Sequence, residues 1–333
     1  MPFNYDKLPA DLLLPRSGMR RRIFFAGKGG VGKTTLASTT AMFAADSGFR
    51  TLLVTTDPAA HIGNLFGETV TSVPRQIPGS NLWLVRIDPK AAFDTYRQRV
   101  LDSLEHQFQD TETALRVSEE LNSPCTEEVA VFQEFLDYVL GDEFDVTVFD
   151  TAPTGHTVRL LQLSWDYEEE LEHKDAFTAE TAALDEAQLA RMNTAIRTLQ
   201  NQEETGMLFV TLPESTPIAE MERAIADLER THIDTQGIVV NQVLPEEAAT
   251  SRLFGKRLEL QMGHIARLKA RSHCQHIAVA TLQDDEIIGT ELLRRFANEV
   301  IEMNKTTPHE VELISTVSKP TETITETIKE TIS

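Results

Sequence analysis

Cysteine, long apolar runs and positive charge are all scarce in this sequence of 333 residues. The two cysteines, Cys125 and Cys274, are too few for a disulfide framework. They form no C-x-x-C pair, which excludes a zinc site built from the thiolates of one chain. No run of about 18 apolar residues occurs, so we expect no transmembrane segment. Residues 1–20 lack a signal-peptide pattern, and we therefore expect a soluble, cytoplasmic protein.

Basic residues are outnumbered by acidic ones, 31 to 52, which gives a formal net charge of −21. This balance argues against a broad basic face, so we do not expect nucleic acid as a partner. Hydrophobic residues make up 41% of the chain, which is enough for a sizeable core. The length suits one large α/β domain or two smaller ones.

Apolar runs typical of buried strands alternate with amphipathic stretches typical of helices. Runs such as Val146–Phe149 lack polar alternation, as strands covered on both faces do. The alternation predicts an α/β fold: a doubly wound, mostly parallel sheet with helices on both faces, plus helical insertions. The predicted strands lie near 22–26, 50–56, 82–88, 144–150, 207–212, 236–241 and 276–280. The predicted helices lie near 34–47, 91–108, 126–140, 184–203, 216–230, 246–270 and 287–304.

The chain is expected to divide into an N-terminal extension over 1–20, one main domain over 21–304 and a tail over 305–333. Polar, acidic stretches predict helical insertions in the main domain near 91–140 and 165–203. The tail is rich in threonine and glutamate, a composition that predicts disorder.

A glycine-rich segment stands between the first predicted strand and the first predicted helix, which is the context of a phosphate-binding loop. Its glycines let the backbone wrap closely around a polyphosphate, and the N–H groups at the helix start point at the charge. We expect Lys33 to reach the β- and γ-phosphates and the Thr34 hydroxyl to bind Mg²⁺. Lys28 comes too early in the loop for that role, so it is free to meet phosphate charge from elsewhere. The segment consists of Gly27, Lys28, Gly29, Gly30, Val31, Gly32, Lys33, Thr34 and Thr35.

Carboxylates stand at the ends of two predicted strands. Asp150 follows the run Phe144–Phe149, and Asp57 follows Thr51–Thr56. A nucleotide triphosphatase needs carboxylates to hold Mg²⁺ and to orient water. We therefore expect Asp150 to bind Mg²⁺, directly or through water, and Asp57 to orient the attacking water. The alternative is that each is a helix cap or a turn residue.

Asn241 closes another predicted buried strand. An amide offers a donor and an acceptor together, so Asn241 can read the edge of an adenine at the carboxyl end of that strand. The alternative for this residue is a turn-forming asparagine.

These segments together resemble the ATPase family that includes the arsenite-pump ATPase ArsA and the tail-anchored-protein targeting factor Get3. The resemblance covers roughly residues 20–300. It rests on the loop 27–35, on Thr56-Asp57-Pro58-Ala59, and on the run from Asp150 to Thr157. That run is specific to the ArsA/Get3 branch of the deviant phosphate-loop ATPases, and it argues against the Min and Par partition ATPases.

The resemblance implies a role for each residue of the site. Lys28 resembles the signature lysine that reaches across a dimer interface to the partner's nucleotide, and with Lys33 and Asp57 it would carry catalysis. Asp150 resembles the magnesium-linked aspartate, and Asn241 the adenine-binding asparagine. ATP and Mg²⁺ are the implied cofactors. ArsA carries two ATPase halves in one chain; this chain has one, over 21–304, so it is expected to form a homodimer with two equivalent sites.

Cys125 and His156 decide what the ATPase is expected to act on. Both resemble residues of the metalloid site of ArsA, and As(III) and Sb(III) are soft, thiophilic ions. The resemblance thus implies the soluble subunit of a pump for arsenite or antimonite, with a membrane subunit as its partner. ArsA has a further cysteine that is missing from 165–185, which leaves open whether Cys274 contributes. The alternative for Cys125 is a small buried hydrophobe.

A Get3-like targeting chaperone with a tail-anchored client is the alternative function. Such factors line a groove with mobile, methionine-rich helices. The corresponding segments 105–125 and 165–190 contain no methionine, and the cysteine pair of the zinc-clamped eukaryotic dimer is missing. The arsenite-type ATPase is therefore the first expectation.

Overall fold

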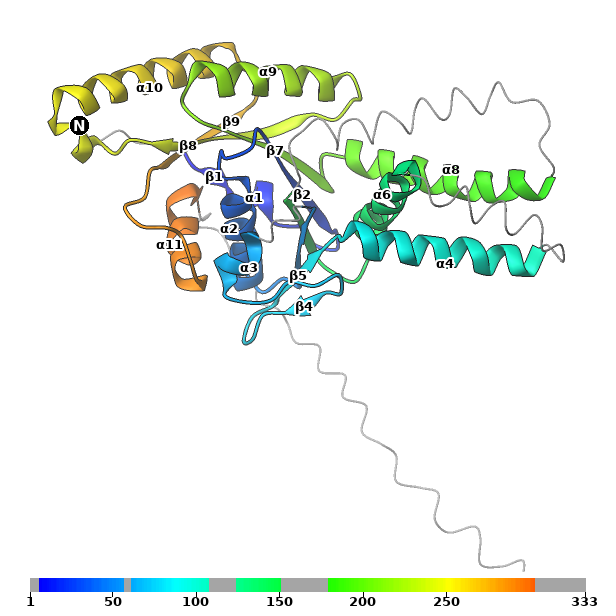
Figure 1. Ribbon diagram of the computed structural model, residues 1–333. Helices are drawn as coiled ribbons and strands as arrows, with labels where there is room; N and C mark the ends of the chain where they lie inside the picture. Colours follow the sequence, from blue (N-terminus) through cyan, green and yellow to red (C-terminus); the bar gives the residue numbers. More distant parts are fainter. Residues whose placement is uncertain (1–5, 57–60, 108–123, 151–178, 303–333) are drawn as a thin grey trace, which may run out of the picture. The chain divides into compact units, whose positions relative to one another are not determined.

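The computed structural model describes residues 6–56, 61–107, 124–150 and 179–302. Its centre is an eight-stranded sheet in the order β4-β5-β3-β6-β2-β7-β8-β9 (Figure 1). Only β4 is antiparallel, and the other strands pair in parallel. The predicted α/β fold with a mostly parallel sheet is confirmed. The strands are β1 (Leu8–Pro9), β2 (Arg21–Ala26), β3 (Thr51–Thr55), β4 (Arg75–Gln76), β5 (Leu82–Arg86), β6 (Val146–Asp150), β7 (Thr205–Thr211), β8 (Thr235–Val243), β9 (His276–Thr281) and β10 (Ile301–Glu302).

Helices cover both faces of the sheet. One apolar layer contains buried residues of α2, α3 and α11, and the other contains buried residues of α6, α8, α9 and α10. Helix α4 packs against α6. None of the helices in the described ranges has the length and apolarity that crossing a bilayer requires. The helices are α1 (Ala10–Leu13), α2 (Lys33–Asp46), α3 (His61–Phe66), α4 (Pro89–Gln107), α6 (Pro124–Leu140), α8 (Ala179–Gln200), α9 (Ser215–Glu229), the 3₁₀ turn η1 (Glu246–Thr250), α10 (Arg252–Arg271) and α11 (Thr290–Val300).

Strand β2 serves both apolar layers at once. Ile23 and Phe25 pack on the side of α2, whereas Phe24 packs on the side of α6 and stacks on Phe149, with ring centroids 4.4 Å apart. Successive side chains of a strand point to opposite faces, so a strand buried on both faces has no solvent-facing position and is mostly apolar. This explains why the run before the glycine-rich loop is apolar without alternation.

The structure differs from the expected elements in several places, and the short elements α1, α3, β1 and β10 are among those that were not predicted. The helix predicted near 246–270 is divided, because Ser251 is extended and its side chain caps the start of α10. The last helix begins only after Gly289, whose φ of 90° is not helical. The short antiparallel β4 was not predicted, although the Pro78-Gly79 turn before β5 is a hairpin signal.

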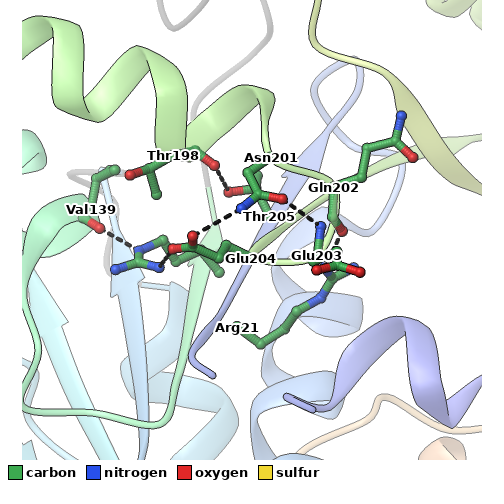
Figure 2. Close-up of polar contacts among 9 residues, drawn as sticks. Arg21, Val139, Thr198, Asn201, Gln202, Glu203, Glu204 and Thr205 are labelled. Carbon is green, nitrogen blue, oxygen red and sulfur yellow. Dashed lines mark hydrogen bonds and ion pairs between the residues drawn. The ribbon is translucent and has the colours of Figure 1, made fainter. Parts of the chain in front are cut away.

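Two buried arginines hold the amino end of β2. Arg21 donates to the carbonyl oxygen of Gln202 in the turn before β7 (Figure 2). It also donates to the carbonyl oxygen of Leu12, which ties α1 to the sheet. Burial, together with the charge of Arg16, lowers the pKa of Arg21 to about 10. Arg22 donates to the carbonyl oxygen of Val139, and it forms an ion pair with Glu204 in the turn before β7. The strand that carries the glycine-rich loop is therefore fixed at its opposite end.

The segment before β2 also packs into the core. Leu8 and Leu13 are fully buried, and β1 pairs in parallel with β10 through Leu8 and Ile301. Part of the 1–20 segment thus belongs to the apolar layer on the α2 side.

Candidate functional site

The glycine-rich loop leaves β2 at the carboxyl edge of the sheet. From β2 the chain passes through α2 to β3 on one side, while β7, β8 and β9 extend on the other side. Open α/β sheets bind ligands at such a switch point, outside the carboxyl ends of the strands. The topology therefore places a ligand site at this loop.

Two glycines give the loop its path. Gly27 has φ 146°, and a Cβ there would lie 2.3 Å from the carbonyl oxygen of Val210 in β7. Gly32, at the amino end of α2, is left-handed with φ 95°, and its Cβ would lie 2.2 Å from Nδ2 of Asn241. A side chain at either position would meet both backbone strain and a collision. The loop therefore needs glycine at both positions.

Lys33 is the first residue of α2 and is only 8% exposed. Its Nζ donates a hydrogen bond of 3.0 Å to the carbonyl oxygen of Lys28, so the ammonium lies inside the curve of the loop. Among the described residues, no side chain caps the amino end of α2. The first N–H groups of the helix and a buried cation thus act together, which is the arrangement that binds a polyphosphate.

Asp150 ends β6 and is 2% exposed. It pairs in register with Thr55 of β3, whose hydroxyl lies 3.4 Å from Oδ2 of Asp150. Asp150 shares one cavity with Thr34. A carboxylate beside a hydroxyl is a hard-oxygen donor set, which suits Mg²⁺.

Asn241 and Gln242 form an irregularity in β8. The register with β9 shifts between Val240 and Val243, and Gln242 has a positive φ of 57°. Asn241 is 6% exposed, and its Nδ2 donates a 2.9 Å hydrogen bond to the carbonyl oxygen of Val31. This side chain thus supports the loop from the neighbouring part of the sheet. Its predicted contact with adenine stays a prediction.

A cavity of about 770 Å³ extends from the loop to the segment that follows β9. The structure brings most of the predicted site residues to this cavity, and it adds a second wall that the sequence analysis missed. The predicted residues in its lining are Gly29, Gly30, Gly32, Lys33, Thr34, Thr35, Asp150 and Asn241. The added residues include Gln242, Thr281, Leu282, Gln283, Ile287 and Ile288. Gln242, Thr281 and Leu282 stand at or just after the ends of predicted strands, so the rule that parallel strands end at one edge would have identified them. Ile287 and Ile288 lie instead in a segment that was predicted to be helical.

Lys28 does not line the described wall of this cavity. Its Nζ lies 2.9 Å from a carboxylate oxygen of Glu220 in α9, and both side chains are partly exposed. The two lysines of the loop therefore differ in placement, since Lys33 lies inside the loop and Lys28 on its outer side.

Three predicted residues cannot be placed through their side chains. Asp57 and His156 lie outside the described residues, and Cys125 lies in the first turn of α6 but its side chain is not described. Cys274 precedes β9 at the amino edge of the sheet, and its Sγ donates to the carbonyl oxygen of His276. Burial raises the pKa of the Cys274 thiol. In the described ranges no cluster of three or more metal-binding side chains occurs.

Comparison with known proteins adds to this geometry. A family model described as anion-transporting ATPase matches residues 20–302. The chain is 41% identical to the putative arsenical pump-driving ATPase of Halobacterium salinarum over 288 residues, which cover 85% of this chain and 44% of that protein. It is 35% identical to an arsenical pump-driving ATPase of Escherichia coli over 275 residues, which cover 83% of this chain and 43% of that protein.

A second group of relatives is closer to this chain in length. The chain is 29% identical to ATPase GET3A of Arabidopsis thaliana over 303 residues, which cover 84% of this chain and 83% of that protein. By contrast, it spans about half the length of the arsenical pump-driving relatives that it matches.

Proposed function

This chain belongs to the anion-transporting ATPase family, and from that membership we propose that it is a Mg²⁺-dependent ATP hydrolase. One observation carries the proposal. The buried ammonium of Lys33, the buried carboxylate of Asp150 and the amide of Asn241 lie around one cavity at the carboxyl edge of the sheet. Cation, carboxylate and amide are the groups that a nucleotide's phosphates, its magnesium and its base require.

Each residue of the site has its own role in the transfer of the phosphoryl group to water. Lys33 and the N–H groups at the start of α2 stabilise the charge that develops on the transferred phosphoryl group. Thr34 and Asp150 would hold Mg²⁺, and the bound ion would supply positive charge to neutralise the phosphates. Asp57 orients the attacking water.

We further propose a homodimer in which Lys28 reaches the nucleotide of the partner. Two features support this role: Lys28 does not line the described wall of its own cavity, and its ammonium is partly exposed on the outer side of the loop. A lysine so placed is available to a second molecule. Hydrolysis would then require two chains.

Replacement of Lys33 tests the hydrolase. We expect Lys33→Ala to lower the rate of ATP turnover by roughly 10²–10³-fold, because one preorganised charge is lost from the transition state. Lys256→Ala, which removes an exposed lysine of α10, is the matched control and should keep the native rate. Undiminished turnover in Lys33→Ala, with unchanged circular dichroism, would sink the mechanism.

For the coupled process we propose efflux of arsenite or antimonite, with a membrane pump subunit as partner and with Cys125 and His156 as metalloid ligands. The proposal is supported by the relatives named as arsenical pump-driving ATPases. A thiolate is the ligand that As(III) prefers. The second candidate is a Get3-like targeting chaperone for a tail-anchored client. It is favoured by the length of the GET3A relative, most of which this chain covers.

The ATPase rate with and without arsenite or antimonite separates these two functions. For the metalloid pump we expect a stimulated rate, loss of the stimulation in Cys125→Ala, and retention of it in Cys274→Ala, because Cys274 lies at the opposite edge of the sheet from the cavity. A rate that does not respond to either metalloid, together with capture of a hydrophobic tail segment, would instead support the chaperone.

A further inference from the structure

Another cavity, of about 850 Å³, lies at the amino edge of the sheet. Its lining comes from α1, the start of β8, α9, the end of α10 and the segment before β9. It shares no lining residue with the cavity at the phosphate-binding loop, which lies at the carboxyl edge. Its volume is in the range of small-molecule sites.

Arg21 brings a buried positive charge to the lining of this cavity. The residue is only 4% exposed. Within the described ranges Arg21 has no ion pair, whereas the adjacent Arg22 pairs with Glu204 at 3.1 Å. The charge of Arg16, which acts on Arg21, has the same sign. A buried charge without an opposite charge is costly, so the site favours an anion.

The guanidinium of Arg21 also keeps one N–H group for a ligand. Nε and Nη2 both donate to the carbonyl oxygen of Leu12, and Nη1 donates to that of Gln202 (Figure 2). Nη2 donates in addition to Oε1 of Gln236. A guanidinium has five N–H groups, so one on Nη1 remains unused by the described residues. Gly206 provides room beside the group, because a Cβ there would lie 2.8 Å from Nη2.

The same cavity contains an unpaired hydroxyl and an apolar wall. Oγ1 of Thr235 is buried and has no hydrogen-bond partner in the part of the chain that the structure describes. Met221 and Ile225 of α9 and Leu268 of α10 add apolar surface. Small-molecule sites combine such surface with a few polar groups that fix the orientation of the ligand. We therefore expect a ligand with an anionic head and an apolar body.

Carboxylates in the lining limit the charge of that ligand. They outnumber the arginines of the lining by five to three, and most of them are exposed to solvent. One negative charge on the ligand is offset by the buried cation, whereas a second would be opposed by these carboxylates. The five are Asp11, Glu203, Glu222, Glu229 and Asp234.

We propose that this cavity binds a small organic monocarboxylate, whose carboxylate accepts a hydrogen bond from Arg21 and whose apolar body packs between α9 and α10. Arg21 recognises the charge of the ligand, and the acidic lining selects against dianions. The proposal stands on its own residues and does not depend on the nucleotide site.

Calorimetric titration of the full chain with octanoate, 1-octanol and octyl phosphate at about pH 8 tests the proposal. The three share one apolar chain, and the phosphate is a dianion at that pH. We expect octanoate to bind at least tenfold more tightly than octanol, which is the effect of a charge-assisted hydrogen bond, and more tightly than octyl phosphate. Equal binding of octanoate and octanol by the native chain would overturn the proposal whether or not any variant folds. Octyl phosphate binding as tight as that of octanoate would overturn the assignment of a monocarboxylate.

Two variants place the ligand. Arg21→Met should remove the preference for octanoate over octanol, and a folded variant that keeps this preference would contradict the role of Arg21. Ile225→Trp narrows the cavity from α9 and should weaken octanoate at least threefold. Arg223→Trp adds the same side chain at an exposed position of α9 outside the lining, and it should bind octanoate as the native chain does. Octanoate binding unchanged in Ile225→Trp would show that the ligand does not occupy this cavity.

Discussion

Gly32→Ala is expected to destabilise the protein through two separate effects at the amino end of α2. The first is backbone strain, because a left-handed conformation costs a non-glycine residue about 1–2 kcal/mol. The second is a collision, because the new methyl group would lie 2.2 Å from Nδ2 of Asn241. Asn241 must then move and lose its hydrogen bond to the carbonyl of Val31, at a cost of about 1 kcal/mol. The sum is a loss of roughly 2–3 kcal/mol in the free energy of unfolding.

A double-mutant cycle with Asn241→Ala separates the two effects. Asn241→Ala alone should cost about 1 kcal/mol, since it removes the same hydrogen bond. In the double variant that bond is lost only once and the collision is absent, so its total cost should be about 1 kcal/mol less than the sum of the single costs. Urea unfolding of the nucleotide-free chain measures all four free energies. Additive costs, within about 0.5 kcal/mol, would show that the collision does not occur.

Two further predictions concern charged groups. Lys28→Ala should abolish ATP turnover, because the charge proposed to reach the partner's nucleotide is removed. It should leave ADP affinity within about twofold, because Lys28 does not line the described wall of its own cavity. A large fall in ADP affinity would place Lys28 in its own cavity. Burial raises the pKa of Glu134 in α6 from 4.5 to about 7, with Asp88 adding to the shift and Arg99 opposing it. The native state therefore holds this proton to higher pH than the unfolded state does, and stability falls between about pH 4.5 and 8. Glu134→Gln should remove that fall and be more stable than the native chain by about 1–2 kcal/mol at pH 8, after discounting for partial exposure. Urea unfolding at pH 4.5 and at pH 8 measures the free energy of unfolding of each chain, and the exposed Glu127→Gln is the control. Equal changes in this free energy between the two pH values for the native and Glu134→Gln chains would contradict the prediction.

The parts of the site that the sequence predicted are those encoded by neighbouring residues. The loop stands in one continuous strand–loop–helix segment, so its glycines, Lys33 and Thr34 are recognisable without any tertiary contact. Asp150 was predicted because it ends an apolar run, and the structure places it in the wall of the same cavity. The strand order explains why Asp150 lies near the loop. Strand β6 is the parallel neighbour of β2, and parallel strands end at a common edge.

The parts that the sequence did not reveal depend on contacts between distant elements. The irregularity at Asn241 and Gln242 arises from the register of β8 with β9, which no local pattern specifies. Lys28 and Glu220 are 192 residues apart in the chain. The acceptors around the buried Arg21 include Gln202 and Gln236, which are 181 and 215 residues away in the chain.

The pairing of β1 with β10 gives the chain a particular response to mechanical force. The two strands are parallel, with Leu8 beside Ile301 and Pro9 beside Glu302. A pull applied before β1 and after β10 draws the strands past each other along their common axis. The backbone hydrogen bonds between them are then loaded together in shear and do not open one after another. When force is applied to the chain before β1 and after β10, the hydrogen bonds of this short ladder must therefore break first. Only then would the force act on the central sheet, which carries the proposed nucleotide site.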